Sequence, residues 1–298
     1  MRISEKHVLS LPTFIYLIIF FILPIMIMLG ISFMESGDFG GVKNLIDFQN
    51  NHLQVNLSLK SYHYVWHSLF IWKLLFRTFI YSIITTFFCL LLGYPVALFI
   101  ARINQKFKNF LLVLIIIPFW SCFLIRVYGW MIILGPNNAI NHMVNTLRSY
   151  FGFEPINLLF TSSAVILCLV YVNLPFMILP LYANLEKHQL DLLEAAIDLG
   201  ASRFKVFMKV TLPLSLPGIL AGSILVFIPS MGMFVIPELF GSNCTYMIGN
   251  LIKQQFLQTM NWPMGTVTAI LMTGIVVIIA VSSNCLSEYV KEFDKDDY

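Results

Sequence analysis

Six long apolar stretches constrain this fold more than any other feature of the sequence. They cover residues 11–34, 74–101, 109–134, 161–183, 214–237 and 262–286. Each is close to the roughly 20 residues that an α-helix needs to cross a bilayer. Backbone polar groups in lipid must be satisfied within the segment itself, which helices achieve. We therefore expect an all-α integral membrane protein with six transmembrane helices.

Composition agrees with a membrane protein and excludes other classes. Charged residues make up 11% of the 298 residues, against about 25% in soluble domains, and the mean hydropathy is +0.83. The net charge of +3 is too small to indicate nucleic acid as a partner. The apolar composition makes membrane lipid the expected environment. No long polar segment separates a soluble domain, which predicts a single transmembrane domain over residues 1–298. The five cysteines form no disulfide framework and no Cys-x-x-Cys metal pair.

The first apolar stretch is expected to stay in the protein as a helix. A signal peptide also begins with basic residues, here Arg2 and Lys6, but its apolar region is shorter than residues 11–34. The sequence Gly30-Ile31-Ser32 is a poor cleavage site. We expect Pro24 to bend this helix.

Basic residues predict the orientation. With both termini and residues 184–213 on the cytoplasmic side, the inner segments hold eleven basic residues and the outer segments seven, as the positive-inside rule requires. The inner set is Arg2, Lys6, Arg102, Lys106, Lys108, Lys187, Arg203, Lys205, Lys209, Lys291 and Lys295. The outer set is Lys43, Lys60, Lys73, Arg77, Arg126, Arg148 and Lys253.

Motifs for catalysis are missing from the sequence. It contains no P-loop, no Gly-x-Ser-x-Gly elbow and no His-Glu-x-x-His. His63 and His67 have metal-ligand spacing, but no third ligand lies near them in the sequence, so interfacial packing is the favoured interpretation. We expect no catalytic residue, no metal and no cofactor, and energy must come from a partner chain or an ion gradient.

Breaks in apolar helices are the best sequence signal for a transport path. Prolines interrupt the stretches at Pro118, Pro175 and Pro229, the last within a Pro-Ser-Met-Gly cluster, and packing kinks are an equally good explanation for the first two. A carboxylate that attracts a cation and aromatic faces that bind ammonium groups would suit such a path. The candidate path residues are Trp120, Tyr128, Ser230, Phe234 and Glu238. The interfacial aromatic belt and a water boundary at Glu238 are the alternatives.

The segment 184–213 is the longest charged helical stretch between two apolar ones. Residues 190–199 are good helix formers, Gly200 suits the left-handed residue that ends a helix, and Ser202 suits the cap of a second short helix. Glu194 and Asp198 lie four residues apart on one helix face. This helix docks on another protein or rests on lipid head groups.

The same segment resembles the "EAA loop" of ABC-importer permeases. Glu194-Ala195-Ala196 is followed by three residues, Gly200, nine residues, and then an aliphatic residue, any residue and Leu-Pro; the family usually has Ile where this chain has Val210. The resemblance implies a cytoplasmic coupling helix that binds an ATPase. The contact residues it implies are Glu194, Ala195, Ala196, Asp198, Gly200, Ala201 and Ser202.

Seven further strings are similar to the B-type permease of bacterial spermidine/putrescine importers. They are LGYPVA (92–97), IPFW (117–120), LIRVY (124–128), LPFM (174–177), VFIPSMGMF (226–234), IGNLIKQQF (248–256) and NWPMG (261–265). This similarity implies a type I ABC-importer permease fold in a bacterial inner membrane and transport by alternating access. It also implies three kinds of partner: a second, related permease, two copies of a cytoplasmic ATPase, and a periplasmic polyamine-binding protein.

Other functions stay open at this point. An ABC permease for ferric iron, sulfate or thiamine would share the coupling loop. An ion-driven secondary transporter would require paired intramembrane charges, of which the apolar stretches contain almost none.

Overall fold

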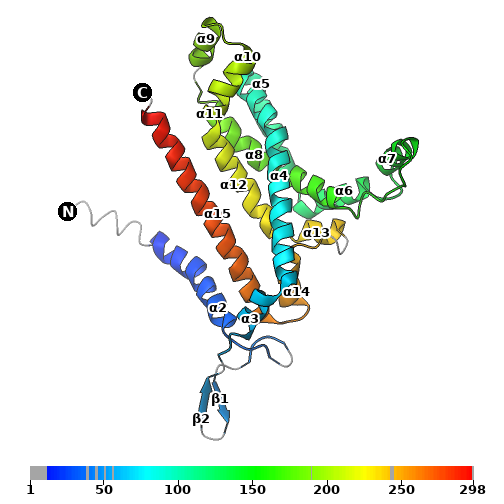
Figure 1. Ribbon diagram of the computed structural model, residues 1–298, viewed down its shortest axis with the longest axis vertical. Coiled ribbons are helices and arrows are strands. Elements are labelled where there is room, and N and C mark those ends of the chain that lie inside the picture. Colours follow the sequence, from blue (N-terminus) through cyan, green and yellow to red (C-terminus); the bar gives the residue numbers. More distant parts are fainter. Residues whose placement is uncertain are drawn as a thin grey trace, which may run out of the picture. The chain divides into compact units, whose positions relative to one another are not determined.

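The computed structural model describes residues 12–37, 40–43, 46–49, 52–55, 57–188, 190–241 and 245–296, and these residues are mainly helical (Figure 1). The chain divides into two compact units. One comprises Met1–Lys73 with Leu251–Ile275, and the other Leu74–Asn250 with Val276–Tyr298.

The first unit begins with a helical span over residues 12–32, in which the π-helical turn η1 (Ile18–Ile22) precedes α2 (Leu23–Ser32). Pro24 stands at the start of α2, directly after this irregular turn. Proline has no N–H to donate backwards, so it suits the beginning of a regular helix. Residues 12–32 form one continuous helical span, and the bend expected at Pro24 stays a prediction. Further along the chain, α3 covers Lys60–His67, and α4 starts directly after Ser68.

A two-stranded antiparallel hairpin departs from the all-α expectation. Strands β1 (Ile46–Gln49) and β2 (His52–Val55) pair in register, with Ile46 opposite Val55 and Phe48 opposite Leu53. Apolar and polar residues alternate in both strands, which is the period of a β-strand rather than a helix. The alternation is visible in the sequence, and it explains the hairpin between α2 and the next helix along the chain.

The second unit contains most of the helices. They are α4 (Leu69–Arg102), α5 (Gln105–Ile116), η2 (Ile117–Trp120), α6 (Phe123–Ile133), α7 (Ala139–Tyr150), α8 (Ser162–Leu185), α9 (Leu190–Asp198), α10 (Arg203–Val206), η3 (Phe207–Thr211), α11 (Leu212–Leu214), α12 (Leu216–Gly232), α13 (Val235–Phe240), α14 (Ile248–Leu257) and α15 (Trp262–Asp296). The first turn of α4 and parts of α14 and α15 belong to the first unit.

Helices α8 and α12 pack closely against each other, and glycines allow this approach. A Cβ built on Gly222 would lie 2.8 Å from Sδ of Met177, and one built on Gly218 would lie 2.7 Å from Cβ of Asn184. Gly93 of α4 faces the same Met177, with a distance of 3.2 Å from its hypothetical Cβ to Cγ. Small residues let membrane helices approach closely where no hydrophobic force drives them together. The three helices share a buried core that includes Ala97, Met177 and Leu181.

Two of the apolar stretches are bent. The pair Gln105–Trp120 and Phe123–Ile133 turns by 91°, so the third span is broken as expected, but after Trp120 rather than at Pro118, and the pair Arg203–Leu214 and Leu216–Gly232 turns by 62°. In contrast, α8 continues through Pro175, and α12 continues through Pro229 to end at Gly232. The Ser230 hydroxyl donates to the carbonyl of Val226, four residues earlier in the same helix, at 2.7 Å.

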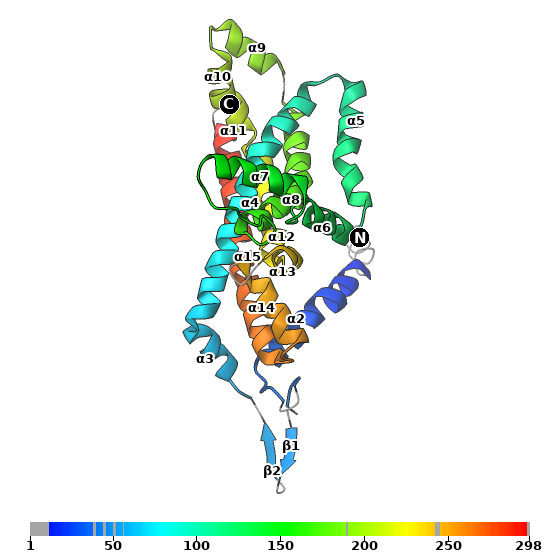
Figure 2. The same ribbon diagram turned by 90° about the vertical axis from the view of Figure 1, so that its right-hand side faces the viewer.

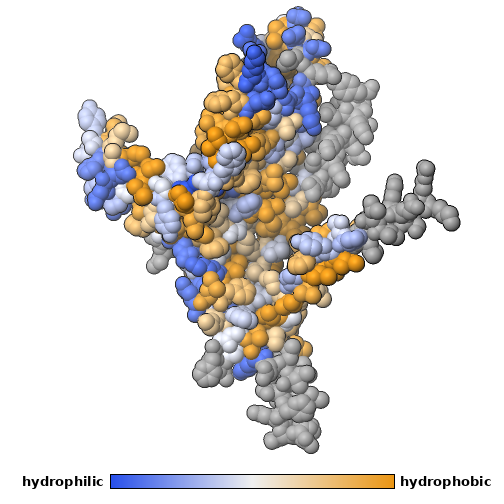
Figure 3. All heavy atoms as spheres, turned by 180° about the vertical axis from the view of Figure 1, so that it is seen from behind, coloured by the Kyte–Doolittle hydropathy of each residue, from blue (hydrophilic) through white to orange (hydrophobic). Residues whose placement is uncertain are grey.

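Among the described residues, four helices are long and apolar enough to cross a membrane, and each bent pair counted as one span would raise the number to six. Figure 3 shows apolar side chains over much of the face that it displays. Large apolar residues of α4 and α5 such as Phe99 and Phe110 are exposed. Lipid is the solvent that such a surface requires.

Candidate functional site

Helix α9 ends in a turn that glycine adopts most easily. Gly200 has a φ of +82°, in the left-handed region that side chains disfavour. Its N–H donates to the carbonyl of Ile197 at 2.8 Å, and the N–H of Ala201 donates to that of Ala196 at 3.1 Å. These two bonds define a Schellman motif, which confirms the helix end expected from the sequence.

The second helix of the segment starts where Ser202 predicts it. The Ser202 hydroxyl accepts a hydrogen bond from the N–H of Lys205 at 3.4 Å and caps α10. The chain then passes through η3 and α11 before α12 begins. Figures 1 and 2 both show α9 and α10 extending beyond the ends of α8 and α12.

We call the segment between α8 and α12, which contains α9 and α10, the excursion. It exposes both charged and apolar side chains. Glu194, Asp198 and Ser202 are exposed, as is Ala195, while Ala196 and Ala201 are half-buried. Leu199 is 89% exposed and Phe204 is 73% exposed, one on each side of the glycine turn. Sequence reasoning missed these two residues, although their position beside Gly200 in a charged stretch is a signal that a partner covers them.

Polar contacts tie the base of this excursion to the helices. Nε2 of His188 lies 3.1 Å from the carbonyl oxygen of Leu214, which joins the two ends of the excursion. The hydroxyls of Tyr94 in α4 and Ser215 lie 3.0 Å apart, and the Tyr94 ring packs edge-on against Phe207 with centroids 5.7 Å apart. The excursion is therefore anchored to α4 and closed at its base.

An ion pair ties the base to α5 as well. Nζ of Lys108, in the first turns of α5, lies 2.9 Å from Oε1 of Glu186, the residue that follows α8. The same nitrogen lies 5.9 Å from the ring centroid of Tyr182. Hydrogen bonds from Tyr182 and Lys108 hold the pKa of the Glu186 carboxyl below its ordinary value. The sequence places Lys108 in a basic loop and gives no sign that this side chain is buried.

The candidate path residues lie on several elements, and two of these, α6 and α13, share a core. Val127 of α6 packs with Ile236 and Phe240 of α13 in one buried cluster. Tyr128 in α6 and Glu238 in α13 are exposed, and Trp120 in η2 is exposed as well. Ser230, by contrast, is fully buried in α12.

Helix α14 fastens the break between α12 and α13. The Asn250 side chain donates to the carbonyl of Phe234 at 2.9 Å and accepts from the N–H of Met247 at 3.2 Å. The N–H of Ile248 donates to the Thr78 hydroxyl of α4 at 2.9 Å. Asn250 is thus a positioning residue for Phe234 that residue types alone did not reveal.

The Glu238 carboxylate acts on Tyr246. Burial raises the pKa of the Tyr246 phenol, and the negative charge of Glu238 raises it further. The guanidinium of Arg77 lies 3.4 Å from the Tyr246 carbonyl oxygen. Glu238 therefore contributes negative potential to a surface that also carries a phenol.

Comparison with known families decides the class of protein. The sequence model of the binding-protein-dependent transport system inner membrane component matches residues 93–291. The chain belongs to this family. With its several apolar helices, it is a multi-pass protein of the cytoplasmic membrane.

Relatives within this family match nearly the whole chain. The spermidine/putrescine transport system permease protein PotB of Escherichia coli (strain K12) is 40% identical over 258 residues, 87% of this chain and 89% of the relative. PotB of Salmonella typhimurium (strain LT2) is 39% identical over 267 residues, 89% and 88% of the two chains. A PotB homolog of Mycoplasma genitalium is 31% identical over 254 residues, 85% and 80% of the two chains.

Solved structures show the fold that this family member adopts. A chain of a bacterial ABC transporter involved in the import of the acidic polysaccharide alginate has a TM-score of 0.63 at 18% identity, covering 97% of this chain and 99% of its own. A chain of the inward-facing MetNI methionine ABC transporter has a TM-score of 0.55 at 20% identity, covering 74% and 95%. The fold is that of an ABC-importer permease.

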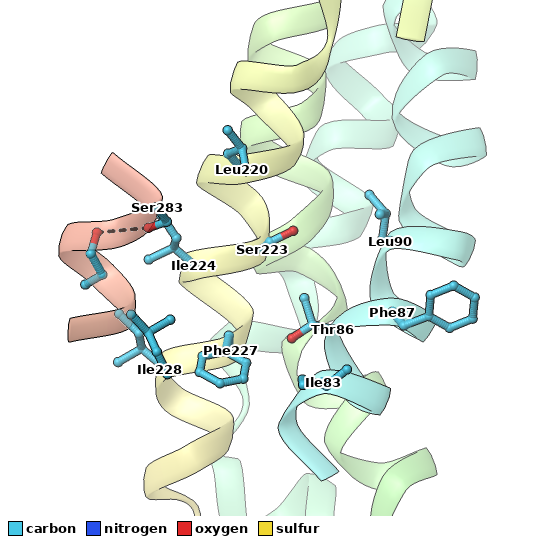
Figure 4. Close-up of a pocket in the computed structure, with 12 residues that line it drawn as sticks. Ile83, Thr86, Phe87, Leu90, Leu220, Ser223, Ile224, Phe227, Ile228 and Ser283 are labelled. Atoms are coloured by element: carbon cyan, nitrogen blue, oxygen red, sulfur yellow. Dashed lines mark hydrogen bonds between the residues drawn. The ribbon is translucent and has the colours of Figure 1, made fainter. Parts of the chain in front are cut away.

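This protein also has a pocket of about 320 Å³ between α4, α12 and α15 (Figure 4). Thr86, Ser223 and Ser283 supply the hydroxyls, and the other lining residues are apolar. None of the lining residues carries a charge, and none is a candidate path residue. Its lining suits an apolar group rather than a charged substrate.

Proposed function

We propose that this chain is the permease subunit of an ATP-driven importer that moves spermidine or putrescine into the cytoplasm. The observation that carries the proposal is the 39% to 40% identity to proteins named as spermidine/putrescine permeases, over nearly nine-tenths of both chains. The chain supplies a path and a coupling surface, and a separate ATPase subunit hydrolyses ATP.

The proposed topology has six spans, each bent pair counting as one, with both termini in the cytoplasm. One connection, between α4 and α5, carries Arg102, Lys106 and Lys108. The other, between α8 and α12, carries Lys187 and Arg203 on either side of α9. Positive charge on these two connections favours a cytoplasmic position for both. The bend of 91° in the third span and that of 62° at the fifth suit broken helices that surround a path.

The proposed coupling surface is the excursion of α9 and α10. Glu194, Ala195, Ala196, Asp198, Gly200, Ala201 and Ser202 contact the ATPase in this proposal. The exposed Leu199 and Phe204 add apolar anchors of the kind that a protein partner buries. The half-buried small residues Ala196 and Ala201 allow the ATPase surface to approach the backbone around Gly200.

The proposed assembly contains this permease, a second related permease, two ATPase copies and a periplasmic polyamine-binding protein. The loaded binding protein docks outside, ATP closes the ATPase dimer, and the coupling helices rock the permeases to an outward-open state. Hydrolysis then resets them. Trp120, Tyr128, Ser230, Phe234 and Glu238 belong to the proposed path, where aromatic faces and the Glu238 charge favour ammonium groups. A weak site is needed, since tight binding would stall release.

Affinity purification from the native membrane tests the proposal. We expect the tagged chain to recover an ATPase and a second permease, with ATP hydrolysis stimulated by polyamine-loaded binding protein. Recovery of the ATPase without polyamine stimulation would keep the importer and overturn its substrate. Recovery of the chain alone, with uptake driven by an ion gradient, would overturn the importer.

A further inference from the structure

The excursion that carries α9 stands on a narrow base. Helix α8 ends at Leu185 and α12 begins at Leu216, and the two approach so closely that Gly218 leaves no room for a methyl group beside Asn184. The intervening residues leave the helix pair and return to it at one place. We call the polar residues at this place the neck: Tyr94, Lys108, Glu186, His188 and Ser215.

Each neck contact joins a different pair of elements. His188 joins the two ends of the excursion to each other, and Tyr94 joins Ser215 to α4. The contact between Lys108 and Glu186 is the one among these that reaches α5. Because α5 leads into the bend of 91° before α6, this ion pair stands between the coupling segment and the broken span.

Packing alone does not hold α9 at the neck. A pocket of about 230 Å³ separates Leu193 of α9 from Leu98 and Arg102 of α4, and Lys108 and Glu186 line the same pocket. A hollow of this size removes the dispersion contacts that would otherwise fix the helix. The ion pair of Lys108 and Glu186 is therefore a direct link between α5 and the residues that lead from α8 into α9.

The ion pair is built as a fixed contact rather than a loose surface pair. The Lys108 side chain is 9% exposed and that of Glu186 is 39% exposed. A buried ammonium that loses its partner is strongly unfavourable, so Lys108 follows Glu186 when Glu186 moves. The Tyr182 hydrogen bond to Glu186 restricts the carboxylate further. Lys106, two residues earlier in the same basic stretch, is exposed, so water solvates its ammonium group and it does not need a carboxylate partner.

We infer that Lys108 and Glu186 form a positioning pair that transmits movement of the coupling segment to α5 and to the broken third span. This inference rests on the proposed function, because it requires that an ATPase moves α9. Loss of the pair would let α9 follow the ATPase while α5 lags behind. ATP would then be hydrolysed with less substrate moved per cycle.

The test compares Lys108→Met, Glu186→Gln and the charge exchange Lys108→Glu with Glu186→Lys, in the full complex reconstituted into liposomes. Polyamine uptake and ATP hydrolysis are measured together. We expect each single variant to lower the polyamine moved per ATP by about fivefold to tenfold, with unchanged ATPase recovery, and the exchange to restore at least half of it. Lys106→Met is the matched control, with an unchanged ratio expected.

Two results would overturn the positioning pair: a normal ratio in both single variants, or an exchange that stays as low as the single variants while present at wild-type amounts in the membrane. Using the near-isosteric Glu186→Gln keeps the test valid if Lys108→Met fails to assemble. Failure of the proposed function is a separate result, since the wild-type complex would then move no polyamine at all.

Discussion

Gly218 of α12 lies so close to Asn184 of α8 that a methyl group on the glycine would be 2.7 Å from the asparagine Cβ. This contact sits where the two central helices meet below the coupling segment. The asparagine Cβ cannot rotate out of the way, because it is bound directly to the backbone. The approach therefore fixes the spacing of α8 and α12 at the base of the neck.

Gly218→Ala is expected to destabilise the protein through this contact. Overpacking of a well-packed site costs about 1–3 kcal/mol, so thermal unfolding of the purified protein in detergent should begin at a lower temperature. Gly274→Ala is the control, because a Cβ there has no atom within 4 Å. Equal unfolding temperatures for Gly218→Ala and the wild type would contradict the packing argument.

Gly200→Asp is expected to uncouple transport while the complex still assembles in the membrane. A side chain at a φ of +82° costs about 1–2 kcal/mol, and the carboxylate obstructs the ATPase surface. Gly200→Asn separates the two effects, because asparagine has nearly the size of aspartate and a similar tolerance of the left-handed region but no charge, and it should retain more uptake than Gly200→Asp. The check is uptake normalised to the amount of co-purified ATPase, and normal uptake by the aspartate variant would refute the coupling assignment.

Glu238→Gln is expected to weaken uptake most at low polyamine concentration. The carboxylate raises the pKa of the nearby Tyr246 phenol, so its negative potential acts on that surface, and a cation there would be favoured too. The measurement is uptake against polyamine concentration, with a raised half-saturation concentration expected. Glu154→Gln, at an exposed glutamate after α7, is the control. Unchanged uptake by Glu238→Gln at all concentrations would remove Glu238 from the path.

The neck has a defined dependence on pH. The folded-state pKa of Glu186 is lowered from its ordinary value of 4.5 by Tyr182 and Lys108, so its ionised form stabilises the folded protein. This contribution is present above 4.5 and is lost as the pH falls through the lowered value. The stability difference between wild type and Glu186→Gln, measured by thermal unfolding, should be constant from neutral pH down to 4.5 and shrink below it. A difference that already disappears between neutral pH and 4.5 would contradict the ion pair.

The segment that contains α9 and α10 was predictable because its structure is local. The left-handed Gly200 and the Ser202 cap need only neighbouring backbone groups, and both are as the sequence indicates. The third span is bent close to Pro118, but the bend itself follows Trp120. The position of the fifth-span break was less predictable, because the helix tolerates Pro229 and ends three residues later at Gly232.

The neck was not predictable because its partners are distant in the sequence. Lys108 meets Glu186 across 78 positions, and Tyr94 meets Ser215 across 121. Nothing in either local sequence distinguishes a buried Lys108 from its exposed neighbour Lys106. The hairpin of β1 and β2 was visible as alternation but was obscured by the apolar character of the rest of the chain.

Accumulation of labelled spermidine in liposomes containing the complete complex tests the central claim most directly. The account predicts accumulation that requires ATP and the binding protein, that unlabelled putrescine reduces by competition, and that Gly200→Asp abolishes. A complex that binds its ATPase and hydrolyses ATP, yet accumulates neither polyamine, would contradict it.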